Sequence, residues 1–230
     1  MKSVYEAAVR SKMAYLEPNE IPFKNEFISS SEDTQVYIWK IDDVVYVTFR
    51  GTSSLKDALD DLDIKRTRVS GKIKVHKGFY KQFQSVQIKI TKILLKLTEN
   101  ASRIIFTGHS LGGALAQIAA AYYGDVLEDI FVTCYTFGSP RVGNKYFVEW
   151  FSKNVNEHVR VVNDNDPVPM IPTMFYWTHT DNISVKLTED SVKYIEKDTP
   201  WYKRMFEVFK SNVKRHSCDE YVSRMELFEQ

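Results

Sequence analysis

The feature that most constrains this chain is the stretch at residues 103–121, which combines a short apolar run, a glycine-rich turn and a run of small residues. The apolar run at 104–106 is typical of a β-strand, and the alanine-rich run at 114–121 is typical of a helix. Between them the sequence reads Gly-x-Ser-x-Gly, centred on Ser110. A strand, a tight turn and a helix in that order are the context in which this motif presents a serine as a nucleophile.

The spacing of this motif has a steric reason and an electrostatic one. The turn is so sharp that a side chain at either flanking position would clash, so Gly108 and Gly112 are both needed as glycine. A helix that begins at Leu111 directs its free N–H groups toward the serine, which suits a developing oxyanion. About one chain of this length in ten carries the motif by chance, as a glycine-rich turn with a solvated serine. The flanking strand and helix favour the nucleophile.

Composition places the chain among ordinary globular proteins and excludes several classes. It has 230 residues, of which 31 are basic and 30 acidic. The length suits one α/β domain spanning 1–230, and a net charge of +1 gives no electrostatic case for nucleic-acid binding. No run approaches about 18 consecutive apolar residues, so no membrane span is expected. Cys134 and Cys218 are too few for a disulfide framework, and we expect free thiols, with a single bridge left open.

Two observations bear on location. The N-terminus lacks the apolar segment of a signal peptide, and free thiols fit a reducing compartment. Together they favour a cytoplasmic over a secreted protein. A signal removed before the numbering begins, or a non-standard export route, would leave the same sequence.

Strands and helices alternate through the middle of the chain. Helices are expected at 3–16, 79–97, 114–121, 144–154, 202–214 and 216–228, and strands at 35–41, 44–49, 104–106, 131–137, 158–162 and 183–187. The first two strands read as a hairpin, 65–76 as a β-ribbon, 18–34 as loop, and 183–187 as the last strand, its direction left open. Residues 55–64 have helical spacing and would form a surface helix or a lid. The alternation predicts an α/β fold with a mostly parallel sheet, helices on both faces and an N-terminal antiparallel hairpin.

A serine nucleophile needs a base and a carboxylate that orients the base. In α/β-hydrolase chains these follow in the order serine, acid, histidine. Asp164 and Asp166 both lie in the loop after the strand at 158–162, and Pro167 makes Asp166 the more rigid candidate.

Two histidines follow the acid, His179 in an aromatic run and His216 in a loop near the C-terminus. We favour His216, because a long loop can bring it over the strand ends, and leave His179 as the alternative. His109, inside the turn, should point away from the serine and act as a packed, hydrogen-bonded core residue.

Five motifs in order make the chain resemble the class 3 lipase family, the fungal triacylglycerol-lipase-like α/β-hydrolases. These are Phe49-Arg50-Gly51-Thr52, Val75-His76-Lys77-Gly78-Phe79, the Gly108–Gly113 turn, Thr136–Asn144, and Asp166-Pro167-Val168-Pro169 with Ile171-Pro172. Together they cover roughly residues 36–220.

The resemblance implies a role for each candidate residue. It implies Ser110 as nucleophile, Asp166 as acid and His216 as base, with Tyr221 completing a late His-x-x-x-x-Tyr pattern. It also implies an oxyanion hole made by the backbone N–H of Leu111 with the backbone N–H and hydroxyl of Thr52. The implied reaction is hydrolysis of acyl esters of lipids, with no metal or cofactor.

The sequence departs from the secreted fungal members of that family. It lacks their signal peptide and disulfide set, and its lid-position segment at 54–63 is charged, which argues against strong interfacial activation. The aromatic residues of 201–209 have helical spacing and could make transient contact with a lipid surface, although packing on the core is the plainer reading. A soluble short-chain carboxylesterase, a phospholipase and an inactive hydrolase scaffold are the alternative functions.

Overall fold

The computed structural model describes residues 2–22, 25–52, 65–127, 129–172, 176–180, 183–189, 191–194 and 212–227. The predicted segment at 55–64 and most of that at 202–214 lie outside these residues. The α-helices are α1 (Lys2–Met13), α3 (Lys77–Leu97), α4 (Leu111–Val126), α5 (Lys145–Asn154) and α7 (Cys218–Glu226). The first five strands are β1 (Glu26–Ser29), β2 (Gln35–Ile41), β3 (Val44–Phe49), β4 (Arg66–Ser70) and β5 (Ile73–His76). The others are β6 (Arg103–His109), β7 (Phe131–Phe137), β8 (Glu157–Asn163), β9 (Ile183–Leu187) and β10 (Val192–Tyr194).

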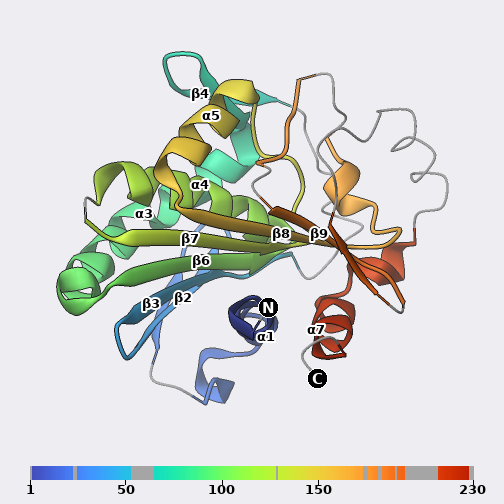
Figure 1. Cartoon of the computed structure of the whole chain (residues 1–230). Coiled ribbons are helices and arrows are strands. Elements are labelled where there is room, and N and C mark those ends of the chain that lie inside the picture. The colour runs from blue at the N-terminus through green and yellow to red at the C-terminus, as the bar shows by residue number, and fades with distance from the viewer. Residues whose placement is uncertain are drawn as a thin grey trace.

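Eight of these strands form one sheet in the order β1-β2-β3-β6-β7-β8-β9-β10 (Figure 1). The strands from β3 to β9 in this order run parallel, and β1, β2 and β10 add antiparallel pairs at the two edges. This confirms the predicted α/β fold with its N-terminal hairpin. The hairpin is extended by β1, which falls inside the predicted loop at 18–34, and β9 is parallel to β8 and is followed by β10.

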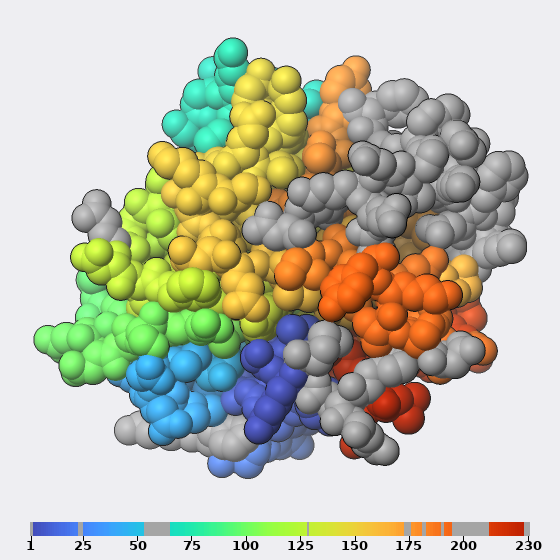
Figure 2. Space-filling view, in the orientation of Figure 1, coloured from blue at the N-terminus to red at the C-terminus, as the bar shows by residue number. Residues whose placement is uncertain are grey.

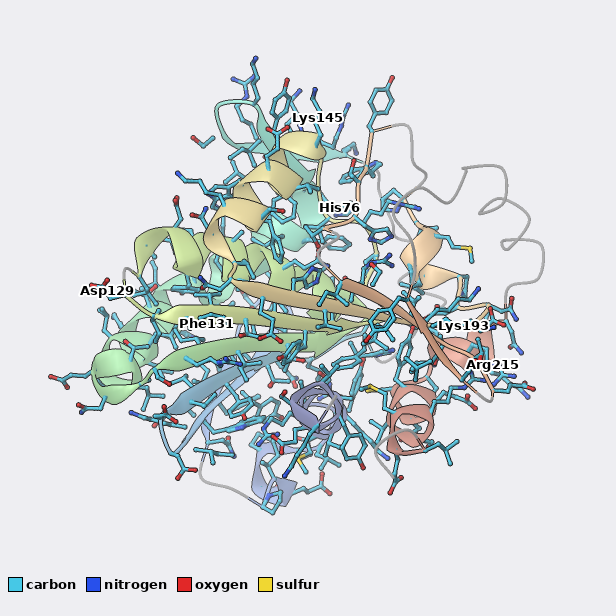
Figure 3. All side chains as sticks on the ribbon, viewed as in Figure 1. His76, Asp129, Phe131, Lys145, Lys193 and Arg215 are labelled. Atoms are coloured by element: carbon cyan, nitrogen blue, oxygen red, sulfur yellow. The ribbon has the colours of Figure 1, made fainter. Side chains whose placement is uncertain are left out.

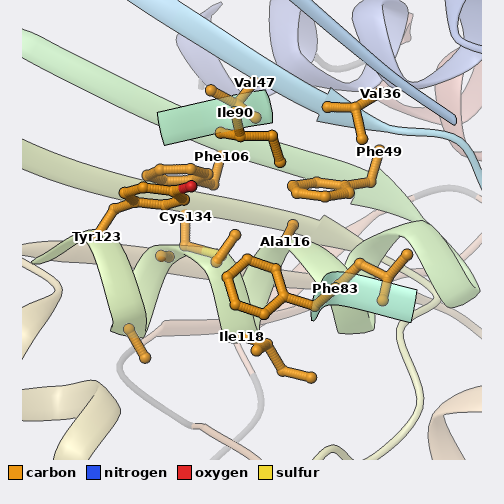
Figure 4. Packing of buried hydrophobic residues seen from close by; sticks show 14 of the residues in the cluster. Val36, Val47, Phe49, Phe83, Ile90, Phe106, Ala116, Ile118, Tyr123 and Cys134 are labelled. Carbon is orange, nitrogen blue, oxygen red and sulfur yellow. The ribbon is translucent and has the colours of Figure 1, made fainter. Parts of the chain in front are cut away.

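Helices cover both faces of the sheet because its central strands are apolar on both sides. On one face, side chains of neighbouring strands such as Val47, Phe106 and Cys134 pack against α3, α4 and α5; Figure 4 shows part of this cluster. On the other face, Ile105 and Tyr135 pack against α1 and α7 (Figure 1). Both cysteines are free thiols.

The carboxyl ends of the parallel strands meet at one edge of the sheet, where α/β proteins place their ligands. Thr52, Ser110, Gly138 and Asp166 each follow such an end, of β3, β6, β7 and β8 respectively. Residues from four separate segments therefore meet at this edge.

Candidate active site

Ser110 lies at the turn between β6 and α4 in a backbone conformation that is rare for a residue with a side chain. Its φ is 59° and its ψ is −127°, which costs about 1–3 kcal/mol. A Cβ on Gly108 would lie 2.3 Å from the backbone carbon of Gly112, and one on Gly112 would lie 2.2 Å from the carbonyl oxygen of Phe49. The steric argument for both glycines is thus met by specific backbone contacts.

The Ser110 backbone is fixed while its hydroxyl is not. Its N–H donates to the Phe137 carbonyl over 2.9 Å. The hydroxyl has no hydrogen-bond partner among the residues that the structure describes. A serine held this way presents its oxygen to an incoming group.

Asp166 is a fully buried carboxylate held by three donors. Oδ1 accepts the N–H of Val168 over 2.9 Å, Oδ2 accepts the hydroxyl of Tyr221 over 2.6 Å, and both oxygens lie within 3.0 Å of Nδ1 of His216. Asp164, the alternative acid, instead forms an ion pair with Lys186 at 2.7 Å and is partly exposed. The structure therefore brings Asp166, and not Asp164, to the histidine.

His216 lies in a 3-10 turn just before α7 and is buried. Because a carboxylate only accepts, Nδ1 carries the proton toward Asp166, and Nε2 is left as an acceptor. Nε2 has no partner among the described residues. The other candidate, His179, donates its Nε2–H to the carbonyl of Pro169 over 2.7 Å.

Gly138 lies between the serine turn and the side chains of the acid and the base. It directly follows Phe137, which binds the Ser110 amide, and its φ of +57° favours glycine. A Cβ at this position would lie 2.9 Å from Oδ2 of Asp166 and 3.1 Å from Cε1 of His216. The absence of a side chain here allows the two groups to lie against the end of β7.

Tyr221 of α7 fixes the acid from the far side. Its hydroxyl accepts the N–H of Asn163 over 2.9 Å and donates to Asp166. Burial and the neighbouring carboxylate raise the pKa of Tyr221 well above its usual value, so it stays a donor. The sequence placed this tyrosine in a pattern but assigned it no contact.

His109 supports the base through a chain of hydrogen bonds that the sequence did not reveal. Its Nε2–H donates to the backbone carbonyl of His216 over 2.6 Å, and the two rings lie 4.5 Å apart between centroids. In this tautomer Nδ1 accepts the hydroxyl of Tyr15 over 2.9 Å. Tyr15 is 94 residues away in sequence, just after α1, and no local pattern signals the contact.

The pKa of His109 predicts a pH-dependent stability. Burial and the neighbouring His216 hold this pKa well below its usual value, so the folded protein keeps His109 neutral. The unfolded chain takes up a proton there below about pH 6.5, so the free energy of unfolding falls as the pH falls through that range. His109→Gln, whose amide can donate the same bond, should reduce this fall. Urea unfolding of both proteins at about pH 7.5 and pH 5.5 measures it, and an equal fall in both would contradict the prediction.

The segment before Thr52 lies against the serine turn. A Cβ on Gly51 would lie 2.5 Å from the carbonyl oxygen of His109, and Thr52 is partly buried. Leu111 is the first residue of α4. Both residues proposed from the sequence for oxyanion binding are therefore on segments that flank Ser110.

Arg141 braces the loop that follows Asp166. Its guanidinium donates to the carbonyls of Met170 and Pro172, and its backbone N–H donates to the carbonyl of Ile171 over 2.8 Å.

No group of three potential metal ligands lies together in the part of the chain that the structure describes.

Comparison with known proteins identifies the family to which this arrangement belongs. The family model for lipase (class 3) matches residues 46–176, which is more than half of the chain. The chain belongs to the class 3 lipase family. The match includes the serine turn, the acid loop and the strands that carry them.

Individual relatives agree with the family match. The chain is 33% identical over 142 residues to the secreted mono- and diacylglycerol lipase 1 of Fusarium solani, covering 59% of this chain and 42% of that protein. It is 34% identical over 136 residues to a lipase of Rhizomucor miehei, covering 56% and 37%. The chain thus spans less than half the length of these relatives.

The fold is shared with a solved fungal lipase. The triacylglyceride lipase of Rhizomucor miehei superposes with a TM-score of 0.82, at 24% identity, over 94% of this chain and 92% of that one. This likeness confirms the α/β-hydrolase fold.

The expected cytoplasmic location is wrong on these comparisons. The Fusarium relative is named as secreted, which contradicts the expectation. The sequence argument failed because neither of its observations fixes a compartment: two free thiols, for example, are compatible with either side of a membrane. Among the described residues, no helix is both long and apolar enough to cross a membrane.

Proposed function

We propose that this class 3 lipase cleaves carboxylic esters of lipids through a covalent acyl-enzyme, with Ser110 as nucleophile, His216 as base and Asp166 as orienting acid. The observation that carries the proposal is the buried contact of Nδ1 of His216 with both oxygens of Asp166, at 3.0 and 2.9 Å, which leaves Nε2 without a partner among the described residues. The base is thereby set in the tautomer that can accept a proton from a serine hydroxyl.

Residues 1–230 act as one domain, because both core clusters pack on the same large sheet.

The reaction begins when the Ser110 oxygen attacks the ester carbonyl and its proton passes to Nε2 of His216. Asp166 stabilises the imidazolium that forms, and it is itself held by Tyr221 and the Val168 N–H. The protonated His216 then gives the proton to the departing alcohol. Water attacks the remaining acyl-serine with His216 again as base, and the fatty acid leaves.

The negative oxygen of each tetrahedral intermediate requires donors. The backbone N–H of Leu111 at the start of α4 supplies one, where the helix dipole also favours negative charge. The backbone N–H and hydroxyl of Thr52 supply the others. Such preorganised donors are commonly worth about 2.7–4 kcal/mol each in the transition state.

An acyl-ester lipid is the substrate class that the family supports. Within this class we propose neutral glycerides as the first substrates to test, because one relative is named a mono- and diacylglycerol lipase. Transient contact with a lipid surface belongs to this proposal, and the aromatic stretch at 201–209 that suggested it lies outside the described residues.

A substrate series tests the proposal and separates it from its alternatives. We expect hydrolysis of p-nitrophenyl acyl esters, and release of fatty acid from triacylglycerol emulsified above its solubility. Activity confined to short, dissolved esters would identify a carboxylesterase, and preferred release from phosphatidylcholine a phospholipase. An absence of hydrolysis with every ester would leave only a catalytically inactive scaffold.

A further inference from the structure

The near-neutral net charge of the chain hides a strongly uneven distribution. Six of the 31 basic residues lie in residues 65–77, a segment that has no aspartate or glutamate. The rest of the chain therefore holds 25 basic residues against 30 acidic ones. This segment is the β4–β5 ribbon with its flanking residues, hereafter the basic ribbon, and among the described residues it forms a two-stranded sheet separate from the large one.

The basic ribbon is joined to the active-site edge of the sheet by backbone hydrogen bonds. The loop at 138–144, which leaves β7 beside the acid and base, pairs with it: His76 N–H donates to the Val142 carbonyl over 2.9 Å and Asn144 N–H to the Lys74 carbonyl over 3.0 Å. In Figures 1 and 2 the ribbon projects from the body next to α5. Its apolar residues Val69 and Ile73 pack toward the core, whereas Arg66, Arg68 and Lys72 are exposed.

Four cations of the ribbon have no carboxylate partner among the described residues. Arg68 and Lys74 lie directly opposite each other across the ribbon, an arrangement of like charges that destabilises a strand pair. No carboxylate among the described residues forms an ion pair with Arg66, Arg68, Lys72 or Lys74. The repulsion between Arg68 and Lys74 destabilises the ribbon, and a negatively charged partner bound at this face would reduce it.

Aromatic rings lie among these cations. Arg66 lies over the ring of Tyr176, at 4.7 Å from its centroid, and the Tyr176 side chain is 66% exposed. The ammonium groups of Lys72 and Lys145 both lie over Tyr146, at 5.5 and 5.0 Å (α5 and Lys145 are in Figure 3). Amphipathic rings beside Lys and Arg are the side chains that favour the head-group level of a membrane.

We propose that the basic ribbon, with Lys145 and Tyr176, is a docking surface for an anionic lipid surface. The choice of a lipid partner rests on the proposed function, because the ribbon is joined to the loop that borders the acid and base. Phosphate and carboxylate head groups supply the missing negative charge, while Tyr176 enters the head-group layer. Docking in this orientation brings the active-site edge toward the source of its esters.

Vesicle sedimentation tests the docking surface without depending on turnover. The protein carries Ser110→Ala, and the vesicles consist either of phosphatidylcholine or of equal parts of phosphatidylcholine and phosphatidylglycerol. We expect binding to the anionic vesicles that weakens as salt rises. Replacing Arg68, Lys72 and Lys74 together by alanine should lower the partition coefficient by about tenfold or more, since each cation near such a surface contributes a several-fold factor.

A matched variant separates the ribbon from general positive charge. Lys89, Lys92 and Lys96 are exposed on α3, and their joint replacement by alanine removes the same charge elsewhere. This control should keep its binding to anionic vesicles, and circular dichroism should show all variants folded. Equal loss in both triple variants, equal binding to the two vesicle types, or ribbon-dependent binding to duplex DNA in preference to vesicles would overturn the proposal. Failure of ester hydrolysis alone would overturn the proposed function and leave the vesicle result standing.

Discussion

Replacing Ser110 by alanine is expected to abolish ester hydrolysis while leaving the protein folded. The substitution removes only the hydroxyl, which makes no hydrogen bond among the described residues, and alanine can hold the same backbone bond to Phe137. Loss of a serine nucleophile commonly lowers kcat by about 10⁶-fold, and the donors around the oxyanion leave a small residual rate. The measurement is the initial rate on a p-nitrophenyl ester, together with labelling by a fluorophosphonate.

Ser223→Ala is the matched control for this prediction. Ser223 is exposed on α7, where its hydroxyl donates only to the carbonyl of Asp219. This variant should keep both the activity and the label. Undiminished hydrolysis by Ser110→Ala would show that another residue carries the acyl group.

Replacing Asp166 by asparagine should lower kcat by about 10⁴-fold with little change in the fold. Asparagine has the same shape, but its amide group cannot accept the Nδ1–H of His216 and the Tyr221 hydroxyl as a carboxylate does. The imidazole then loses both its tautomer and the charge that stabilises its protonated form. Steady-state kinetics on a soluble ester, with KM and kcat determined separately, should place the loss in kcat.

Asp164→Asn makes the same chemical change two residues earlier. Asp164 pairs with Lys186 and does not contact the histidine, so this variant should retain the activity of the natural protein. Equal loss in the two variants would mean that the loop, and not the carboxylate of Asp166, is what the substitution disturbs.

Local sequence patterns predicted most of the elements that build this site. The strands at 35–41, 44–49 and 131–137 are observed with the same bounds, because their apolar residues and flanking turns leave few alternatives. The turn at Ser110 was predictable for the same reason: its glycines are required by contacts within about five residues and with one adjacent strand. The short strand β1 was missed, because four residues at an edge carry no periodic signal of their own.

The direction of β9 was left open for a related reason. Its five residues are apolar enough for a strand, but whether they run parallel or antiparallel is set by β8, with which they pair through Val159 and Ile183. Pairing partners are chosen by the whole chain, so a strand's direction is seldom written in its own residues.

The basic run at 65–77 can be seen in the sequence, but the sequence alone does not indicate that it forms a binding surface for an anionic partner. Counting charges over the whole chain gave +1 and no case for an anionic partner. The strand register places Arg68 opposite Lys74 on one face, and the tertiary structure bonds the ribbon to the loop at 138–144, which begins beside the acid and the base.

By itself, the sequence determined the serine turn and the positions along the chain of the strands on either side of it. Both follow from backbone sterics and the periodicity of apolar residues. The tertiary structure decided which aspartate contacts which histidine. Asp166 and His216 are 50 residues apart, and the sequence offers Asp164 and His179 as alternatives of the same residue types. It alone revealed that Tyr15 reaches the base through His109. Such contacts depend on where α1 and α7 pack beneath the sheet, and short-range patterns do not encode that packing.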